Sequence, residues 1–185
     1  MMDVWPAGRA LAYFDTELAK LANPHHRQSL ASFRTHWYGE VTGDIDLAMS
    51  VVSEQSDFSV IGALAGGEAF AVHGKAAHRA VLEALPRLGL NAGGSFSNIR
   101  LAFADWGVMM EATYANVVYG NMLANLGDLD ADRLFLFRAP MTMVCEFNGE
   151  GIMCRKRDYF GAATAEPADL DVLARLISLE DHYEL

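Results

Sequence analysis

The stretch MTMVCEFNGEGIMCRKRDYF, residues 141–160, alternates apolar and polar residues on both sides of a turn signal. Asn148, Gly149 and Gly151 are typical of a tight turn between antiparallel strands. With a two-residue loop at Gly149-Glu150, directly opposed residues share one face of the sheet. The stretch therefore predicts a β-hairpin, and the assumed loop length fixes which residues lie on each of its faces.

The two faces of this hairpin differ in character. The more apolar face is expected to pack on helices and carries Met141, Met143, Cys145, Phe147, Ile152, Cys154, Lys156, Asp158 and Phe160. The other face carries Thr142, Val144, Glu146, Met153, Arg155, Arg157 and Tyr159. Charges on an apolar face are costly unless they are paired or solvated. Lys156 and Asp158 are thus predicted to be a structural ion pair near the strand end, charges at a strand end open to water, or an acid/base pair in a pocket.

In the rest of the chain, the spacing of apolar residues predicts helices first and strands after them. Helical spacing predicts a helix between Trp5-Pro6 and Asn23-Pro24, and further helices over 27–41, over 45–52 and after Gly74. A short strand is expected at 56–61, and alternation predicts long strands at 96–105, 106–119, 133–147 and 152–160. This order is typical of an α+β fold with helices on one face of an antiparallel sheet.

Composition narrows the class of protein and of partner. The chain has 185 residues, 52% of them hydrophobic, and a formal net charge of −10. That charge argues against nucleic acid and anionic membranes as partners, and no apolar run is long enough to span a bilayer. The two cysteines do not make a disulfide framework, and the N-terminus lacks the pattern of a secretion signal. A cytoplasmic location is expected.

Three stretches together carry a resemblance to a known family. They are HWYGEVTGDIDLAMSVVSEQSDFSV at 36–60, GKAAHRAVLEAL at 74–85 and FNGEGIMCRKRDYFG at 147–161. In this order they resemble the nuclear transport factor 2-like superfamily, in its SnoaL-like and ketosteroid-isomerase-like branch. The resemblance implies a curved antiparallel sheet wrapped as a cone around helices, an internal ligand cavity, and homodimers formed through the outer face of the sheet.

The resemblance also divides the chain into segments. It covers 27–161 as the cone domain, preceded by an N-terminal helix in 1–26 and followed by an acidic helical tail in 162–185. The tail is expected either to pack over the domain or to reach a neighbouring subunit.

The residues differ from ketosteroid isomerase at its catalytic positions. The isomerase's tyrosine falls at His36, its general-base aspartate near Val60 and its protonated aspartic acid at Met143. Because both carboxylate positions are apolar here, steroid isomerisation by the same residues is not expected. The inward position of Met143 in the matched hairpin implies that Lys156 and Asp158 also point into the cone.

Five residues are candidates for catalysis: His36, His78, Tyr114, Lys156 and Asp158. Histidine can exchange protons near neutral pH, and tyrosine can donate a hydrogen bond to a developing oxyanion. The alternatives are structural: hydrogen-bonded core histidines and a packed tyrosine. Six further residues are candidates for substrate binding: Trp37, Phe58, Asn116, Met141, Met143 and Phe160. In WGVMMEATYAN at 106–116, strand parity separates Glu111 from Tyr114 and predicts an outward Glu111.

Polar groups of mixed type around an apolar pocket favour a cofactor-independent enzyme that works by general acid/base chemistry. Among the reactions that the resemblance implies, a lyase is favoured, because the isomerase's paired aspartates are missing while acid/base residues remain. Dehydration or aldehyde-eliminating cleavage of a small, hydrophobic, aromatic, hydroxylated substrate is the expected reaction. The alternatives are an isomerase or cyclase of the same family, or a small-molecule-binding dimeric module without catalysis. The histidine spacing matches no metal-binding motif, so no metal and no cofactor are expected. Val144, Met153 and Tyr159 are the expected contacts of the homodimer.

Overall fold

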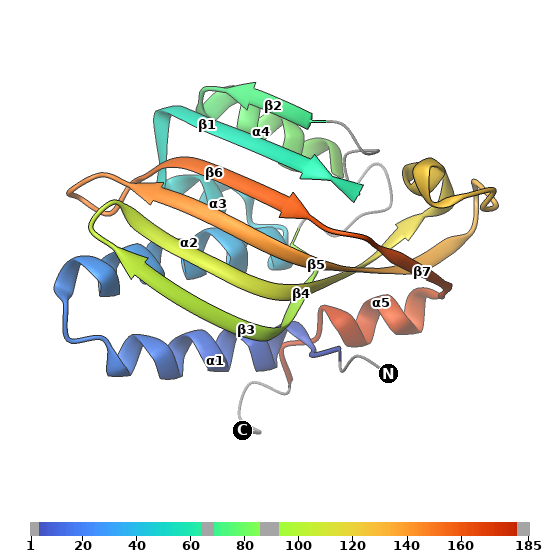
Figure 1. Ribbon diagram of the computed structural model, residues 1–185, viewed down its shortest axis with the longest axis horizontal. Helices are drawn as coiled ribbons and strands as arrows, with labels where there is room; N and C mark the ends of the chain where they lie inside the picture. The colour runs from blue at the N-terminus through green and yellow to red at the C-terminus, as the bar shows by residue number, and fades with distance from the viewer. Residues whose placement is uncertain (1–3, 64–68, 86–92, 181–185) are drawn as a thin grey trace.

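The computed structural model describes residues 4–63, 69–85 and 93–180, which form a curved seven-stranded sheet with the N-terminal helices on its concave face and the C-terminal helix on its outer face (Figure 1). The helical elements are α1 (Ala7–Lys20), α2 (Pro24–Thr42), α3 (Ile45–Ser50), α4 (Lys75–Ala84), η3 (Gly120–Leu126) and α5 (Leu170–Leu176). The strands are β1 (Val52–Gly62), β2 (Ala69–His73), β3 (Ser95–Ala104), β4 (Gly107–Tyr119), β5 (Leu134–Phe147), β6 (Met153–Phe160) and β7 (Thr164–Pro167).

The strand order is β2-β1-β6-β5-β4-β3, and β7 pairs with β5 beyond the end of β6. All neighbours are antiparallel except β1 and β6, which run parallel. The α+β cone predicted from the sequence is thereby confirmed. The parallel pairing of β1 with β6 was not predicted. The strands β2 and β7 were not predicted, because both are short and neither has a clear alternation.

The hairpin between β5 and β6 differs from its prediction in one respect. A two-residue loop is wrong: Asn148 N donates to Ile152 O at 3.0 Å and Asn148 Oδ1 accepts from Ile152 N at 2.9 Å, which closes a longer loop. Lys156 consequently pairs with Cys145, and Asp158 pairs with Met143. Because side chains alternate along a strand, this shift of two residues leaves both charged residues on the inner face.

A register shift next to this loop moves Met153 to the other face of the sheet. The pairing changes between Glu146 and Phe147, and Met153 then lies opposite Phe147, with only 1% of its surface exposed. A bulge reverses the side on which the following residues point. The prediction that Met153 lies on the outer face is therefore wrong, whereas Tyr159 is exposed there.

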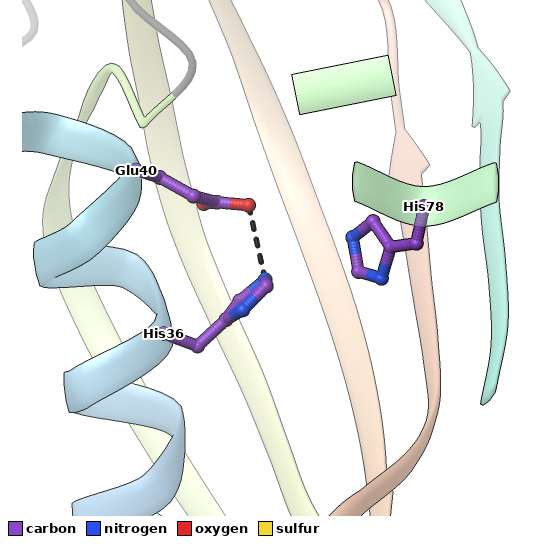
Figure 2. Close-up of side chains that lie close together, drawn as sticks. All are labelled: His36, Glu40 and His78. Carbon is purple, nitrogen blue, oxygen red and sulfur yellow. Dashed lines mark ion pairs between the residues drawn. The ribbon is translucent and has the colours of Figure 1, made fainter. Parts of the chain in front are cut away.

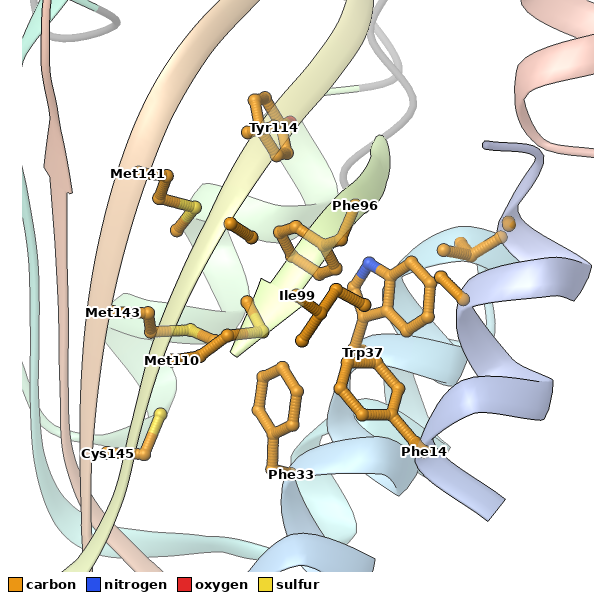
Figure 3. Packing of buried hydrophobic residues seen from close by; sticks show 14 of the residues in the cluster. Phe14, Phe33, Trp37, Phe96, Ile99, Met110, Tyr114, Met141, Met143 and Cys145 are labelled. Atoms are coloured by element: carbon orange, nitrogen blue, oxygen red, sulfur yellow. The ribbon is translucent and has the colours of Figure 1, made fainter. Parts of the chain in front are cut away.

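The core lies between the helices and the concave face of β3, β4 and β5 (Figure 3). Phe14 on α1 packs edge-on against Phe33 and Trp37 on α2, with ring centroids 5.4 and 5.6 Å apart. Met110 and Met143 approach from β4 and β5. This packing fixes α2, the helix that carries His36, against the sheet.

The outer face of the sheet is divided between solvent and the C-terminal tail. Glu111 is exposed, as strand parity predicted. One of its carboxylate oxygens lies 3.7 Å from a guanidinium nitrogen of Arg100. Further along β4, the outward residues Ala115 and Val117 are covered by Leu176 of α5. The tail thus packs on its own domain. No helix in the described part of the chain is both long and apolar enough to cross a membrane.

Leu176→Ala should destabilise the protein by about 2–3 kcal/mol, because it removes a side chain buried between α5 and β4. Leu170→Ala is the matched control in the same helix, since Leu170 is 69% exposed and its loss should change stability by less than about 0.5 kcal/mol. Urea denaturation of both variants measures the difference. Equal midpoints for the two variants would contradict the packing of the tail.

Candidate functional site

The site begins where α2 turns into α3. Gly43 ends α2 in the left-handed conformation at φ 75°, and Asp44 caps α3 by accepting from Leu47 N at 3.0 Å. Gly39 permits the close packing of the two helices, since a Cβ there would lie 2.5 Å from Ala48 N. The packing places Ala48 O 2.8 Å from His36 Nδ1. His36 is thereby held in one orientation inside the protein.

His36 and Glu40 are one helical turn apart, and both point into the interior (Figure 2). His36 Nε2 lies 3.0 Å from Glu40 Oε1. His78, on α4, faces the pair from the opposite side (Figure 2). All three side chains are buried, and one ligand atom from each lies within 4.8 Å of the others. These are the described residues that could hold a metal ion.

Lys156 connects this group to the sheet. Its Nζ donates to Glu40 Oε1 at 3.2 Å and lies 3.6 Å from Asp158 Oδ2. Lys156 and Asp158 are 7% and 5% exposed, so the strand does not end in open solvent at this point. This burial contradicts a strand end open to water and is compatible with both a structural ion pair and an acid/base pair.

Burial and neighbouring charges shift the proton affinities within the cluster. Burial raises the pKa of Asp158 to about 6, although Lys156 opposes this shift. Burial also acts to raise the pKa of Glu40, but Lys156 and His36 outweigh it and lower this pKa to about 2. Burial acts to lower the pKa of Lys156, but Asp158 and Glu40 raise it overall. Glu40 and Lys156 are therefore permanently charged, and Asp158 titrates near neutral pH.

His78 differs from the rest of the cluster in its hydrogen bonding. Neither ring nitrogen makes a hydrogen bond to any residue that the structure describes, although the side chain is only 1% exposed. The ring stacks on Phe58 at 4.4 Å between centroids. Burial, with the nearby charges of His36 and Lys156, lowers the pKa of His78 to about 3. The imidazole is therefore neutral at physiological pH, and a catalytic role for His78 stays a prediction.

Tyr114 and Asn116 form a second polar pair on the inner face of β4. Asn116 Nδ2 donates to the Tyr114 hydroxyl oxygen at 2.9 Å, and Asn116 Oδ1 accepts from Val117 N at 2.8 Å. Burial raises the pKa of Tyr114, so the hydroxyl keeps its proton. Since Asn116 uses the oxygen as an acceptor, the hydroxyl proton of Tyr114 is directed elsewhere.

The candidate binding residues divide into two groups. Met141, Met143 and Phe160 lie in the main core cluster on the concave face, and Phe58 lies beside His78. Trp37 also belongs to the core, where its indole nitrogen donates to Gly93 O at 2.9 Å and its ring packs on Phe96 and Phe14. Its position is explained by packing against α1 and β3.

Glu40 is the residue of the site that the sequence analysis missed. A glutamate in a helix is usually a solvent-exposed charge. The available signal was its spacing of four residues from His36, which places both on one helix face. The contact with Lys156 joins residues 116 positions apart and depends on the fold. The grouping of His36 with His78 likewise follows no sequence motif.

Comparison with known proteins rests on structure alone, because no protein-family profile and no curated protein sequence matches the chain. A candidate polyketide cyclase from Xanthomonas campestris pv. campestris is similar over 83% of this chain and 99% of its own, with 13% identity and a TM-score of 0.56. An NTF2-like protein from Burkholderia xenovorans covers 83% and 98%, with 14% identity and a TM-score of 0.54.

A third similar structure contains a ligand. It is a Mycobacterium tuberculosis protein in complex with estradiol-17beta-hemisuccinate, covering 74% of this chain and 98% of its own, with 12% identity and a TM-score of 0.52. At these identities, the similarity concerns the fold.

Glu40→Gln and Lys156→Met should each destabilise the protein by about 3 kcal/mol, because each removes one member of a buried ion pair and leaves the other charge less well compensated. The loss of unfolding free energy in the double variant should be smaller than the sum of the losses in the two single variants, by at least about 2 kcal/mol. Chemical denaturation at neutral pH measures this coupling. The exposed pair Arg100 and Glu111 is the control, with coupling near zero. Additive losses at Glu40 and Lys156 would show that the two do not interact.

Proposed function

We propose that this chain, whose fold is that of the nuclear transport factor 2-like superfamily, is a lyase that works by general acid/base chemistry inside its cone. One observation carries the proposal: burial raises the pKa of the Asp158 carboxyl group to about 6, and its Oδ1 has no hydrogen-bond partner among the described residues. A base of this kind is charged at neutral pH and has an oxygen available for a substrate proton.

In the proposed reaction, ionised Asp158 removes the proton from a carbon beside a carbonyl group of the substrate. The ammonium of Lys156 has three N–H donors, of which two are directed at Glu40 and Asp158, so the third can stabilise the enolate oxygen. The hydroxyl of Tyr114 can donate to the same oxygen. The enolate then expels a β-hydroxyl group, which takes the proton from Asp158 and leaves as water.

Glu40 has a positioning role in this scheme. Its pKa of about 2 keeps it ionised, so it holds Lys156 in the charged form and next to Asp158. Without Glu40, Lys156 would pair with Asp158 alone, and the pKa of Asp158 would fall as this contact tightened. Asn116 plays a similar part for Tyr114, because it fixes the hydroxyl oxygen.

The side chains around the cluster favour an apolar, aromatic, hydroxylated substrate. Met141, Met143 and Phe160 line the same concave face as Lys156 and Asp158. A similar M. tuberculosis protein holds a steroid hemisuccinate, which supports a hydrophobic ligand in this fold. An isomerase or cyclase is the second candidate, because the same base could return its proton to another carbon, and one similar structure is a candidate polyketide cyclase.

Asp158→Asn should lower kcat/KM by about 100-fold to 10,000-fold, since it removes the proton acceptor. A panel of aromatic β-hydroxy ketones, followed by the absorbance of the conjugated product, provides the assay. In the wild type, kcat/KM should rise with pH through about 6, as Asp158 ionises, and then level off.

Glu111→Gln is the control for this experiment, because Glu111 is exposed on the opposite face of the sheet. Full activity of Asp158→Asn would disprove the assigned base. Binding of the ketones without turnover by the wild type would favour the non-catalytic binding module.

We also propose that the chain forms a homodimer through the outer face of its sheet. Met109 and Tyr159 are 42% and 39% exposed there, and Val144 pairs with Met109. Tyr159→Glu should shift the protein from dimer to monomer at micromolar concentration in light scattering, because a charge would have to be buried in the interface. A monomeric wild type at that concentration would contradict the dimer.

A further inference from the structure

We propose that His36, Glu40 and His78 bind a divalent first-row transition metal ion, for which Zn²⁺ is the practical probe. This site goes beyond the proposed acid/base reaction, whose steps use Asp158, Lys156 and Tyr114. Two imidazoles and one carboxylate suit Zn²⁺ or Fe²⁺ and are poor ligands for Mg²⁺ or Ca²⁺, which prefer oxygen. The three side chains come from two helices and converge in the interior (Figure 2).

The first argument is the orientation of His36. A carbonyl oxygen can only accept a hydrogen bond, so His36 Nδ1, 2.8 Å from Ala48 O, must carry a proton. In a neutral ring the lone pair is then on Nε2, the atom that faces Glu40. Histidines that bind metals commonly donate their other nitrogen to a backbone carbonyl in this way. The contact of His36 with α3 therefore fixes the tautomer that a metal requires.

The second argument is the contact between His36 and Glu40. Nε2 lies 3.0 Å from Glu40 Oε1 and still makes no hydrogen bond of acceptable geometry. When Nε2 carries no proton, this nitrogen and the carboxylate oxygen both offer lone pairs, and a bound cation would satisfy the two together. Two ligand atoms bonded at about 2.0–2.2 Å to one Zn²⁺ lie about 3–3.5 Å apart. The observed separation of 3.0 Å is compatible with two ligands of one ion, and an ion pair between Glu40 and a protonated His36 has the same length.

The third argument is His78, which the acid/base scheme does not use. Both of its nitrogens are buried without a hydrogen-bond partner in the described part of the chain, and an unpaired polar group in the interior costs free energy. One of them lies within 4.8 Å of the ligand atoms of His36 and Glu40. A bound ion would satisfy this nitrogen with a small rotation of the ring, which stacking on Phe58 would guide.

Lys156 is the competing cation at this site. It donates to Glu40 Oε1 at 3.2 Å, so a metal ion and the ammonium would share one carboxylate. A carboxylate has two oxygens and can serve both, and Asp158 offers Lys156 a second partner at 3.6 Å. The repulsion between the two cations gives a sharp expectation: removing the charge of Lys156 should strengthen metal binding.

The test uses the full chain without an affinity tag, stripped by a chelator and titrated with Zn²⁺. The wild type should bind one equivalent. His78→Phe keeps a ring against Phe58 and should weaken Zn²⁺ binding by at least about 100-fold. Loss of a residue that only hydrogen-bonds to a metal ligand usually costs less than this. His25→Ala/His26→Ala, which removes two histidines near the surface, is the control and should bind as the wild type does. Lys156→Met should bind more tightly.

A second measurement does not depend on how the variants fold. X-ray absorption of the Zn²⁺-loaded wild type should show two imidazole ligands and a carboxylate oxygen at about 2.0–2.2 Å. Failure of the wild type to bind Zn²⁺, a spectrum without two imidazoles, or equal affinity in folded His78→Phe would each overturn the proposal. Because none of these readouts involves turnover, they are independent of the fate of the proposed lyase activity.

Discussion

The buried ammonium of Lys156, placed between two carboxylates, is the interaction on which the site depends. Moving a charged lysine into the interior is costly, and Glu40 and Asp158 repay that cost only when both stay close. The two carboxylates are not equivalent, because Glu40 has a pKa of about 2 and Asp158 of about 6. One partner therefore holds the lysine permanently, and the other can exchange a proton.

This arrangement requires α2 and β6 to be packed together correctly. Glu40 comes from the helix and Lys156 from the strand, so their contact forms only when the helix lies against the concave face. The aromatic contacts of Phe14 and Phe33 with their neighbours fix the helix on the core. Gly39 allows α3 to approach closely enough to hold His36. The apolar core thus determines the geometry of the polar cluster.

Much of the fold follows from local sequence patterns, and the hairpin shows why. The inward orientation of Lys156 and Asp158 was predicted correctly even though the loop length was wrong, because a shift of two residues preserves the face. Met153 was placed wrongly, because a bulge changes the face and leaves no clear mark in the sequence. The outward position of Glu111 required only strand parity.

The candidate site was less accessible to sequence reasoning. Glu40 reads as an ordinary helix charge until β6 is placed against α2, and His78 reads as a core residue until α4 is placed opposite His36. Both contacts join residues that are far apart in the sequence. The local pattern could identify which polar residues point inward, but not which of them share a contact.

The ionisation of Asp158 is the most direct test of the central claim that a shared buried lysine leaves one carboxylate ready to exchange a proton. Carbon-13 NMR of the labelled Asp158 carboxyl group, followed as a function of pH and assigned with Asp158→Asn, reports this ionisation. The expected midpoint is near pH 6, well above the ordinary value of 3.8 for aspartate. A midpoint at or below about 4, typical of a solvated aspartate, would contradict the account.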